Sequence, residues 1–524
     1  MKKNIYIFLG LLTAFILSCS TDLDDVEARL KKLEENASKE EPKDLPAQPK
    51  VASIKKFGFL ASDNPVELMQ DVIGDVQDDG FIECWADHIM NSKDLSPIIE
   101  WEGQQLFIND EQYVPNKKYD FSKPVTMVVQ SDTVTKKYVV NMHAFTGLPI
   151  LTIETEGHQD ILSKVDYLRA HFTLREDVQT RSAGSYMEMD GQIKGRGNWT
   201  WGERKKPYRI KFDEKQSLLD EPKNKSWVLL ANLADKSLIR NQIAFELSKM
   251  SNLEYTPSSH FVEVLLNNHF RGNYQLCDKL KIGKHRINVG DDGFFLEVDH
   301  RLYREPDARL FSVPHIEYAV DVKEPDVEYD DPNFNYIKHV FEVADAALFA
   351  DNYTDETNGW RKYIDETSLV DWYLINEIAK NNDAQFIGSC FFNVRRDGKI
   401  KFGPVWDFDI AFGNWDRYGM DTPEGFVVSR TMWMNRFYTD PLFVKNVKER
   451  FAYFYSKRYE IAQLINTYSR YLERSANEND SKWDIFNNYD EHNFLLGNYQ
   501  NECQWFKEWI FSRLEWLKNE FDKL

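Results

Sequence analysis

The stretch GPVWDFDIAFGN, residues 403–414, places two carboxylates inside an apolar and aromatic run. Asp407 and Asp409 are two positions apart, and in a strand such side chains point to the same side. Two carboxylates buried on one side repel each other, so one takes up a proton unless a cation lies between them. Mg²⁺ is held in proteins by one or two carboxylates together with substrate phosphates. The stretch predicts a site for a hard divalent cation, and the competing interpretation is that these acids cap helices or pair with Arg240 or Arg395.

A third acid lies upstream of this pair. NEIAKN, residues 376–381, has the pattern of a helix end, and Asp383 follows it in a loop. The segment SCFFNVRRDGKIKFG predicts a β-hairpin with an Asp-Gly turn at 397–398, which returns the chain to the two carboxylates. We therefore expect Asp383 to lie near the pair, where it can accept a hydroxyl proton.

A basic stretch, KGRGNWTWGERKKPYRIKF at residues 194–212, is the second constellation. Two glycines flank Arg196 and allow backbone N–H groups to approach an anion closely. Arg209 and Lys211 share one face of the strand predicted there, and Lys206 falls on the other face if the strand already includes it. A strand lysine after a Gly-rich turn is suited to a nucleotide's phosphates. The alternative is a basic edge strand with a tight turn, because the spacing G-x-G-x-x-x-x-G is neither that of ordinary protein kinases nor a Walker A sequence.

The elements that must position these residues change in character along the chain. Residues 51–147 hold the β-rich runs VTMVVQS and KKYVVNMH around a polar SDT turn, which predicts a hairpin within an immunoglobulin-like sandwich. Residues 148–524 begin with strand-like runs and continue with helices, the first at 236–250 and the last at 502–521. The expected fold class is α+β, with a small all-β domain ahead of a larger mixed domain.

The N-terminus has the pattern of an export signal. Lys2 and Lys3 precede the apolar run IYIFLGLLTAFIL, and the ending ILSC resembles a bacterial lipobox in which Cys19 is acylated. We expect residues 1–19 to be a lipoprotein signal peptide and the rest to be extracytoplasmic, held to the outer membrane by the lipid on Cys19 and exposed at the cell surface. An ordinary cleaved signal peptide is the alternative.

A spacer is expected to follow. Residues 20–50 predict a short heptad helix and then a charged, Pro-containing linker. The heptad positions within 23–37 indicate either a weak oligomer contact or a solvated spacer helix.

The charge balance excludes one class of partner. The chain of 524 residues has a net charge of −20, whereas nucleic-acid backbones require clustered Lys and Arg. We therefore expect no nucleic-acid partner and no adsorption to anionic membrane surfaces. The cysteines after Cys19 lack metal-ligand spacing, so we expect buried free thiols at Cys84, Cys277, Cys390 and Cys503.

Taken together, these motifs resemble the spore-coat-protein-H (CotH) kinase family. The resemblance runs from about residue 150 to 524 through RGNWTW…KKPYRIKF, WVLLANLADKSLIRNQIAFEL, GNYQLCDKLKIG, GFFLEVD, NEIAKNND and GPVWDFDIAFGN, in this order. The acidic stretch STDLDD, which directly follows Cys19, resembles the export signals of surface lipoproteins in Bacteroidetes.

The resemblance implies an atypical protein kinase fold, with a β-rich small lobe, a helical large lobe, and ATP and Mg²⁺ between them. It implies transfer of a phosphoryl group to a Ser or Thr hydroxyl of a protein substrate. By the same resemblance, Lys206 or Lys211 would contact the ATP phosphates, Arg196 and Asn198 would shape the loop over the nucleotide, Asp383 would be the base or orienting carboxylate, Asp407 would bind Mg²⁺, and Asp409 would support the metal or its waters.

The sequence departs from kinase patterns at two places. The position five residues after Asp383, where ordinary kinases have a metal-binding Asn, is Gly388, with Ser389 the nearest polar residue. The family's Glu in the GxYxLxE pattern is Asp278 here. A catalytically inactive kinase-like surface module that binds a glycan or a protein is therefore the alternative function. Glycoside hydrolysis by two carboxylates is a third interpretation, which no other motif supports.

Overall fold

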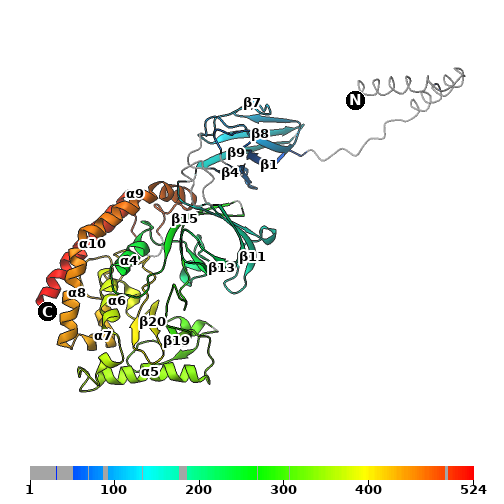
Figure 1. Ribbon diagram of the computed structural model, residues 1–524. Coiled ribbons are helices and arrows are strands. Elements are labelled where there is room, and N and C mark those ends of the chain that lie inside the picture. The colour runs from blue at the N-terminus through cyan, green and yellow to red at the C-terminus, as the bar shows by residue number, and fades with distance from the viewer. Residues whose placement is uncertain are drawn as a thin grey trace.

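The chain forms β units at one end and a helical region at the other (Figure 1). The computed structural model describes Lys31 and residues 51–524 apart from 69, 87–91, 133, 145, 176–185, 268, 306 and 490–493. The expected signal peptide, Cys19 and, apart from Lys31, the heptad segment 23–37 lie outside the described residues. Within the described part, no helix is both long and apolar enough to cross a membrane.

Two sheets over one apolar core form the N-terminal β unit. The predicted hairpin is confirmed, since Ser131 pairs with Val134 across the turn between two antiparallel strands. The sheets have the orders β2-β1-β5 and β3-β4-β9-β8-β6-β7. Their strands are β1 (Ser53–Phe59), β2 (Val72–Ile73), β3 (Asp75–Val76), β4 (Phe81–Ala86), β5 (Ile98–Glu102), β6 (Gln105–Ile108), β7 (Glu111–Gln112), β8 (Val125–Ser131) and β9 (Val134–Ala144). The arrangement is a two-sheet sandwich, and the immunoglobulin-like topology stays a prediction.

A closed seven-stranded barrel follows, with the order β10-β11-β12-β13-β14-β16-β15. Its strands are β10 (Ile150–Thr155), β11 (Leu168–Arg175), β12 (Tyr186–Gly195), β13 (Tyr208–Gln216), β14 (Asn224–Leu230), β15 (Ser259–Leu266) and β16 (His269–Asp278). The barrel closes where β10 pairs in parallel with β15, from Ile150 opposite Glu263 onward. Alternate side chains such as Ile193 and Ile210 fill the barrel's own core. The sequence predicted strands here, but it did not predict closure.

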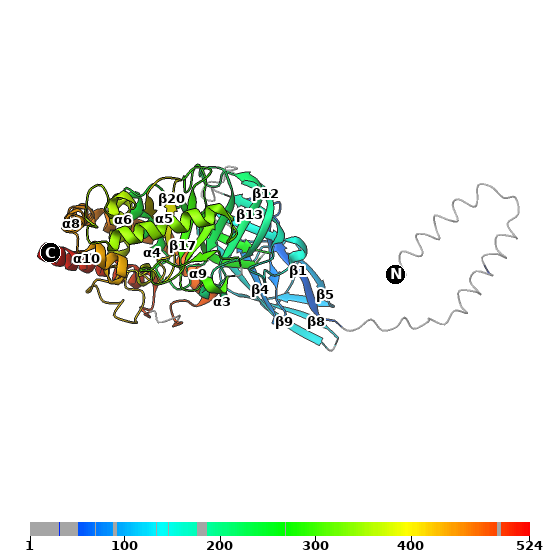
Figure 2. The ribbon, with the colours of Figure 1, turned by 90° about the horizontal axis from the view of Figure 1, so that it is seen from below.

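The helical region includes a five-stranded antiparallel sheet with the order β18-β19-β17-β20-β21. The predicted Asp-Gly hairpin is confirmed as β20 paired with β21. In Figures 1 and 2, α8 and α10 lie toward the end away from the N-terminal β unit, whereas α9 lies next to the barrel. The strands are β17 (Phe294–Val298), β18 (Leu310–Phe311), β19 (Val320–Glu324), β20 (Cys390–Val394) and β21 (Ile400–Phe402). The α-helices are α3 (Trp199–Gly202), α4 (Arg240–Lys249), α5 (Pro332–Phe349), α6 (Glu366–Ile378), α7 (Met432–Phe437), α8 (Pro441–Ser456), α9 (Arg458–Trp483) and α10 (Tyr499–Lys523), and the short 3₁₀ turns are Glu156–His158, Leu302–Arg304, Trp360–Lys362, Asn382–Ala384 and Val428–Arg430.

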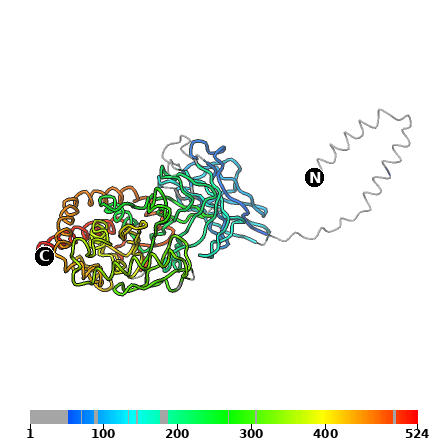
Figure 3. The backbone as a smooth tube through the Cα atoms, turned by 60° about the horizontal axis from the view of Figure 1, so that its bottom comes forward, coloured from blue at the N-terminus to red at the C-terminus, as the bar shows by residue number. Residues whose placement is uncertain are grey.

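Helix α9 is fastened to the barrel by polar contacts in a buried position. The ammonium of Lys205 donates to the carbonyl of Ala231 at 2.8 Å and to Oδ1 of Asn479 on α9 at 2.9 Å. It also donates to the carbonyl of Asn273 on β16. Gly272, in the left-handed region at φ +85°, lets β16 approach Asn479 closely. Figure 3 shows the barrel between the N-terminal β unit, in blue, and the C-terminal helices, in orange and red. The mixed α+β class is therefore confirmed, with a barrel as its β-rich part, and the bilobal kinase-like arrangement stays a prediction.

The four described cysteines agree with the expectation of free thiols. Cys84, Cys277, Cys390 and Cys503 are all unpaired and buried. Burial raises the pKa of the Cys277 thiol to about 12. A thiol that ionises so poorly is a packing group rather than a nucleophile.

Candidate active site

Asp383 is positioned by the end of α6. The helix begins at its N-cap Asp365, which accepts from the N–H of Ser368 at 2.8 Å, and it ends at Ile378. The side chain of Asn381, itself buried, then accepts from the N–H of Asp383 at 3.2 Å. The same side chain donates to the backbone carbonyl of Asp407 at 3.4 Å. One buried amide thus links the segments that carry two of the predicted carboxylates.

Residues 407–409, Asp-Phe-Asp, lie in a loop that is called the DFD loop below. The prediction of a strand around these acids is therefore wrong. Strand β21 ends at Phe402, and Asp407 lies in the left-handed region at φ +71°. Strict alternation therefore does not relate Asp407 to Asp409. Hydrogen bonds fix the loop instead: the N–H of Phe408 donates to Oδ1 of Asn241 at 2.7 Å. The Nδ2 of Asn414 donates to the carbonyl of Asp409 at 2.6 Å.

The structure nevertheless brings the three carboxylates within electrostatic range of one another. Burial, and then the charge of Asp407, raises the pKa of Asp383 to about 6. Burial, followed by the charges of Asp407 and Asp383, raises the pKa of Asp409 well above its usual value. Ser389 donates its hydroxyl to Oδ2 of Asp407 at 3.3 Å. The three carboxylates therefore create a local excess of negative charge, which a bound cation would relieve.

The donor set suits a hard cation that also binds phosphate. Among the described residues, no group of three or more His, Cys, Asp or Glu side chains is arranged to enclose a metal ion. Mg²⁺ does not require such a group, because it keeps waters and shares phosphate oxygens with one or two carboxylates. Asp407 and Asp409 fit that requirement by donor type and by their mutual repulsion.

Sequence reasoning missed an Asp–Arg pair beside Asp383. At the end of β17, Arg301 donates from Nε to Oδ1 of Asp299 at 2.9 Å and from Nη2 to Oδ2 at 2.6 Å. A methyl group added to Gly388 would lie 2.8 Å from Nη2 of Arg301 and 3.2 Å from Oδ2 of Asp383, so a larger residue here would displace the guanidinium. The charge of Arg301 acts to lower the pKa of Asp383, against burial. The available signal was the charged triplet Asp299–Arg301 directly after the apolar strand.

Arg196 lies within electrostatic range of Asp407 and Asp409, whereas Asn198 is exposed. Burial lowers the pKa of Arg196, while Asp407 and Asp409 act to raise it. Its guanidinium lies 5.9 Å from the ring centre of Trp406. Asn198 is exposed at the start of α3 and makes no capping hydrogen bond with its side chain. Arg196 is therefore the residue of the Gly-rich stretch that faces the DFD loop.

The two lysines expected at the phosphates lie in different surroundings on the barrel. The ammonium of Lys206 donates to the carbonyl of Trp201 at 2.6 Å, ahead of the start of β13. Lys211 is exposed on β13, on the outer face that it shares with Arg209. Their role as phosphate ligands stays a prediction.

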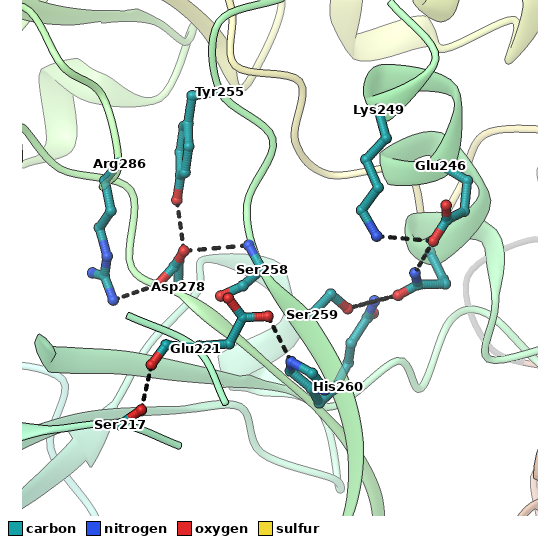
Figure 4. Close-up of polar contacts among 12 residues, drawn as sticks. Ser217, Glu221, Glu246, Lys249, Tyr255, Ser258, Ser259, His260, Asp278 and Arg286 are labelled. Atoms are coloured by element: carbon teal, nitrogen blue, oxygen red, sulfur yellow. Dashed lines mark hydrogen bonds and ion pairs between the residues drawn. The ribbon is translucent and has the colours of Figure 1, made fainter. Parts of the chain in front are cut away.

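The carboxylate of Asp278, the residue at the position of the family's Glu, forms hydrogen bonds and an ion pair within the fold (Figure 4). It accepts from the hydroxyl of Tyr255 at 3.0 Å and from the N–H of Ser258 at 3.2 Å, and it forms an ion pair with Arg286. These partners hold the end of β16 against the loop that follows α4. Asp278 is therefore a structural residue in this arrangement.

Comparison with known proteins decides the family. Residues 193–517, more than half of the chain, match the CotH family, described as CotH kinase protein. The chain belongs to the CotH kinase family. The match spans every site residue above from Arg196 to Asp409, and it begins inside β12, so the first barrel strands lie ahead of it.

Other comparisons with this CotH family member add little. No curated protein matches it. Among solved structures, it is similar to a DUF4623 family protein from Bacteroides eggerthii, with 9% identity over 33% of this chain and 49% of that one and a TM-score of 0.15. It is also similar to a putative glycoside hydrolase from Bacteroides thetaiotaomicron, with 14% identity over 35% of this chain and 53% of that one and a TM-score of 0.16. The chain thus spans about half the length of these structures, and at such TM-scores neither carries an argument about fold or function.

Proposed function

We propose that this CotH family member is an atypical protein kinase that transfers the γ-phosphoryl group of ATP to a Ser or Thr hydroxyl of a protein, with Mg²⁺. The observation that carries the proposal is the set of three mutually repelling carboxylates, Asp383, Asp407 and Asp409, with Arg196 facing them. Phosphoryl transfer needs little more than positioning and charge neutralisation, and a site of acids and a guanidinium supplies both.

Each acid has a role that follows from its surroundings. Asp407 and Asp409 would hold Mg²⁺, which when bound neutralises charge on the phosphate oxygens. Asp383, with a pKa of about 6, is mostly ionised at neutral pH and accepts the hydrogen bond of the substrate hydroxyl. The hydroxyl oxygen forms a bond to the γ-phosphorus, the bond from that phosphorus to the bridging oxygen of ADP breaks, and the hydroxyl proton passes to Asp383.

The test is incorporation of label from γ-³²P-ATP into the full chain or an added protein acceptor, with Mg²⁺. Asp407→Asn should lower incorporation at least about a hundredfold, because it removes a charged ligand of the Mg²⁺ that would neutralise the reacting phosphate. Asp351→Asn, which changes an exposed acid on a surface turn, is the matched control and should leave incorporation unchanged. Equal incorporation by the protein and its Asp407→Asn variant would reject the proposal. A thermal shift with a glycan, without one for ATP and Mg²⁺, would favour the non-catalytic module instead.

We also propose that the protein is a lipoprotein of the outer membrane, exposed at the cell surface and anchored through Cys19. Support comes from the sequence alone: the basic start, the apolar run and the ILSC ending. Labelling of growing cells with a radioactive fatty acid should mark the protein and should not mark a Cys19→Ala variant. Label on both proteins would contradict the anchor.

A further inference from the structure

Two cations face each other on the outside of the barrel, where like charge is unfavourable. Lys194 on β12 lies directly opposite Arg209 on β13 in the antiparallel register. Opposed like charges destabilise a sheet, and neighbouring Ile193 and Ile210 fill the barrel core, so both basic side chains project outward. The Lys194 ammonium lies 4.7 Å from the ring centre of Tyr167, and the Arg209 guanidinium lies 6.0 Å from it. The two cations thus share one aromatic platform.

Two hydrogen-bond donors at this platform have no acceptor within the described part of the chain, whereas the Lys194 ammonium donates to the carbonyl of Val165 at 3.3 Å. The Nε of Arg209 is buried and unpartnered, and so is the hydroxyl of Tyr167. Burial of such groups without partners costs folding free energy, so each orphan requires an explanation. A bound acceptor that carries negative charge would satisfy both donors and would also separate the opposed cations electrostatically.

Lys279 adds a third cation to the same neighbourhood. It follows directly after β16, and burial together with the charge of Arg209 lowers its pKa to about 8. Burial and the charge of Arg209 likewise lower the pKa of Lys194. The nearest carboxylate oxygen to the Lys279 ammonium, Oε1 of Glu324, is 3.8 Å away. Lys279 is thus weakly paired within the described part, and its charge is poorly tolerated without a ligand.

The barrel face that carries these cations is the one turned toward the helical region. Arg209 lies opposite Val228, which in turn lies opposite Cys277, and both of those side chains belong to the core shared with the helices. Arg196 feels the charges of Arg209 on one side and of Asp407 and Asp409 on the other. A positive surface on the barrel therefore adjoins the negative surface of the three acids. This charge pattern matches a multivalent anion that carries its own divalent cation.

We propose that Lys194, Arg209 and Lys279, together with the Tyr167 hydroxyl, form a binding site for a condensed phosphate chain. The proposal rests on the proposed function and deepens it, since it assigns the triphosphate to residues other than Lys206 and Lys211. Three separate cations around an aromatic hydroxyl fit a chain of linked phosphates better than a single carboxylate or sulfate, because each phosphate presents its own oxygens. Both a nucleoside triphosphate and inorganic polyphosphate have this chemistry.

The test measures binding by calorimetry on the full chain, with sodium tripolyphosphate, ATP and adenosine as separate probes. Arg209→Met keeps the aliphatic stem and removes the guanidinium, so it should weaken tripolyphosphate binding roughly tenfold or more, as loss of charge-assisted hydrogen bonds does. Lys279→Met should weaken it similarly. Lys215→Met, at another exposed position of strand β13, is the matched control and should change the Kd less than twofold. Arg209→Lys retains the charge and serves if the methionine variant does not fold.

The outcomes separate this site from the catalytic proposal. Tripolyphosphate binding as tight as that of ATP identifies the phosphate chain as the recognised part. Tighter ATP binding that Arg209→Met also weakens identifies a nucleotide and supports the same residues. Failure of tripolyphosphate to bind, or equal binding by Arg209→Met and the unchanged protein, overturns the site. Loss of phosphoryl transfer to every acceptor, with Arg209-dependent binding intact, rejects the kinase activity and leaves this site standing.

Discussion

The side chain of Asn241, at the start of α4, accepts a hydrogen bond from the backbone N–H of Phe408 at 2.7 Å. Both residues are buried. The bond connects the helix that follows the barrel's first strands to the loop that carries Asp407 and Asp409. The position of Asp407 and Asp409 therefore depends on a helix far earlier in the chain, since Asn241 and Phe408 are separated by 167 residues.

Asn241→Ala should lower both stability and activity. It leaves the buried N–H of Phe408 without a partner, which costs about 1–3 kcal/mol of unfolding free energy. Denaturant unfolding measures the first effect, and label transfer from ATP measures the second. Asn358→Ala changes an exposed asparagine on a turn and should alter neither quantity. Unchanged activity in Asn241→Ala would show that the loop holds its shape without this bond.

Arg301→Gln should move the acidic limb of the pH–activity profile to higher pH. The pKa of Asp383 is about 6, and the charge of Arg301 acts to lower it. Removal of that charge raises the pKa, so a higher pH is needed before Asp383 is ionised and can accept the hydroxyl proton. The profile of kcat/KM between pH 5 and pH 8 shows the displacement. Arg395→Gln, at an exposed arginine, should leave the limb where it is.

Glu263→Gln should stabilise the protein at neutral and higher pH. Burial raises the pKa of Glu263 from 4.5 to about 7, although the hydroxyl of Thr146 donates to it at 2.6 Å. Because the folded-state pKa is the higher one, the stability linked to this proton is complete below about pH 4.5 and is lost as pH rises through about 7. The loss amounts to roughly 3 kcal/mol at most.

Denaturant unfolding at pH 5 and pH 8 tests this prediction. The advantage of Glu263→Gln over the unchanged protein should grow between the two pH values. Glu154→Gln, at an exposed position on β10, should show no such growth. A constant difference across the range would mean that Glu263 is not the titrating group.

Gly272→Ala should destabilise the junction between the barrel and α9. Gly272 has φ +85°, and an added methyl group would collide with Oδ1 of Asn479. Left-handed backbone costs a non-glycine residue about 1–2 kcal/mol, and the overlap adds to it. Thermal melting of the two variants measures the effect. The methyl group of Gly202→Ala would meet no atom within 4 Å, and Gly202 does not have a left-handed backbone, so this control should keep the melting temperature of the unchanged protein. Equal melting temperatures would show that the junction yields without cost.

Local patterns in the sequence predicted local structure well. The Asp-Gly turn and alternating residues fixed the hairpin β20–β21, and apolar periodicity placed α4, although the helix begins at Arg240 rather than at 236. The barrel could not be predicted because its closure pairs β10 with β15, whose sequence separation exceeds any periodic signal. Long-range pairing of this kind depends on the whole fold.

The candidate site shows the same division. Residue types and spacing indicated Asp383, Asp407 and Asp409, and these side chains do interact. Spacing misled on the local geometry, since Asp407 adopts a left-handed conformation that alternation does not foresee. The opposition of Lys194 and Arg209 depends on strand register, and Arg301 and Asp383 meet beside Gly388 only in the folded chain. Neither contact can be predicted from the sequence without knowledge of the fold.

The burial of the cysteines makes it practical to measure domain motion with dyes attached to introduced cysteines. Cys84, Cys277, Cys390 and Cys503 are buried in the described part of the chain. A thiol-reactive dye should therefore not react with them in the folded protein. Cysteines introduced at two exposed positions, one on the barrel and one on α8, would then carry a fluorescent donor and acceptor. Energy transfer between the dyes would report directly whether tripolyphosphate draws the barrel and the helices together.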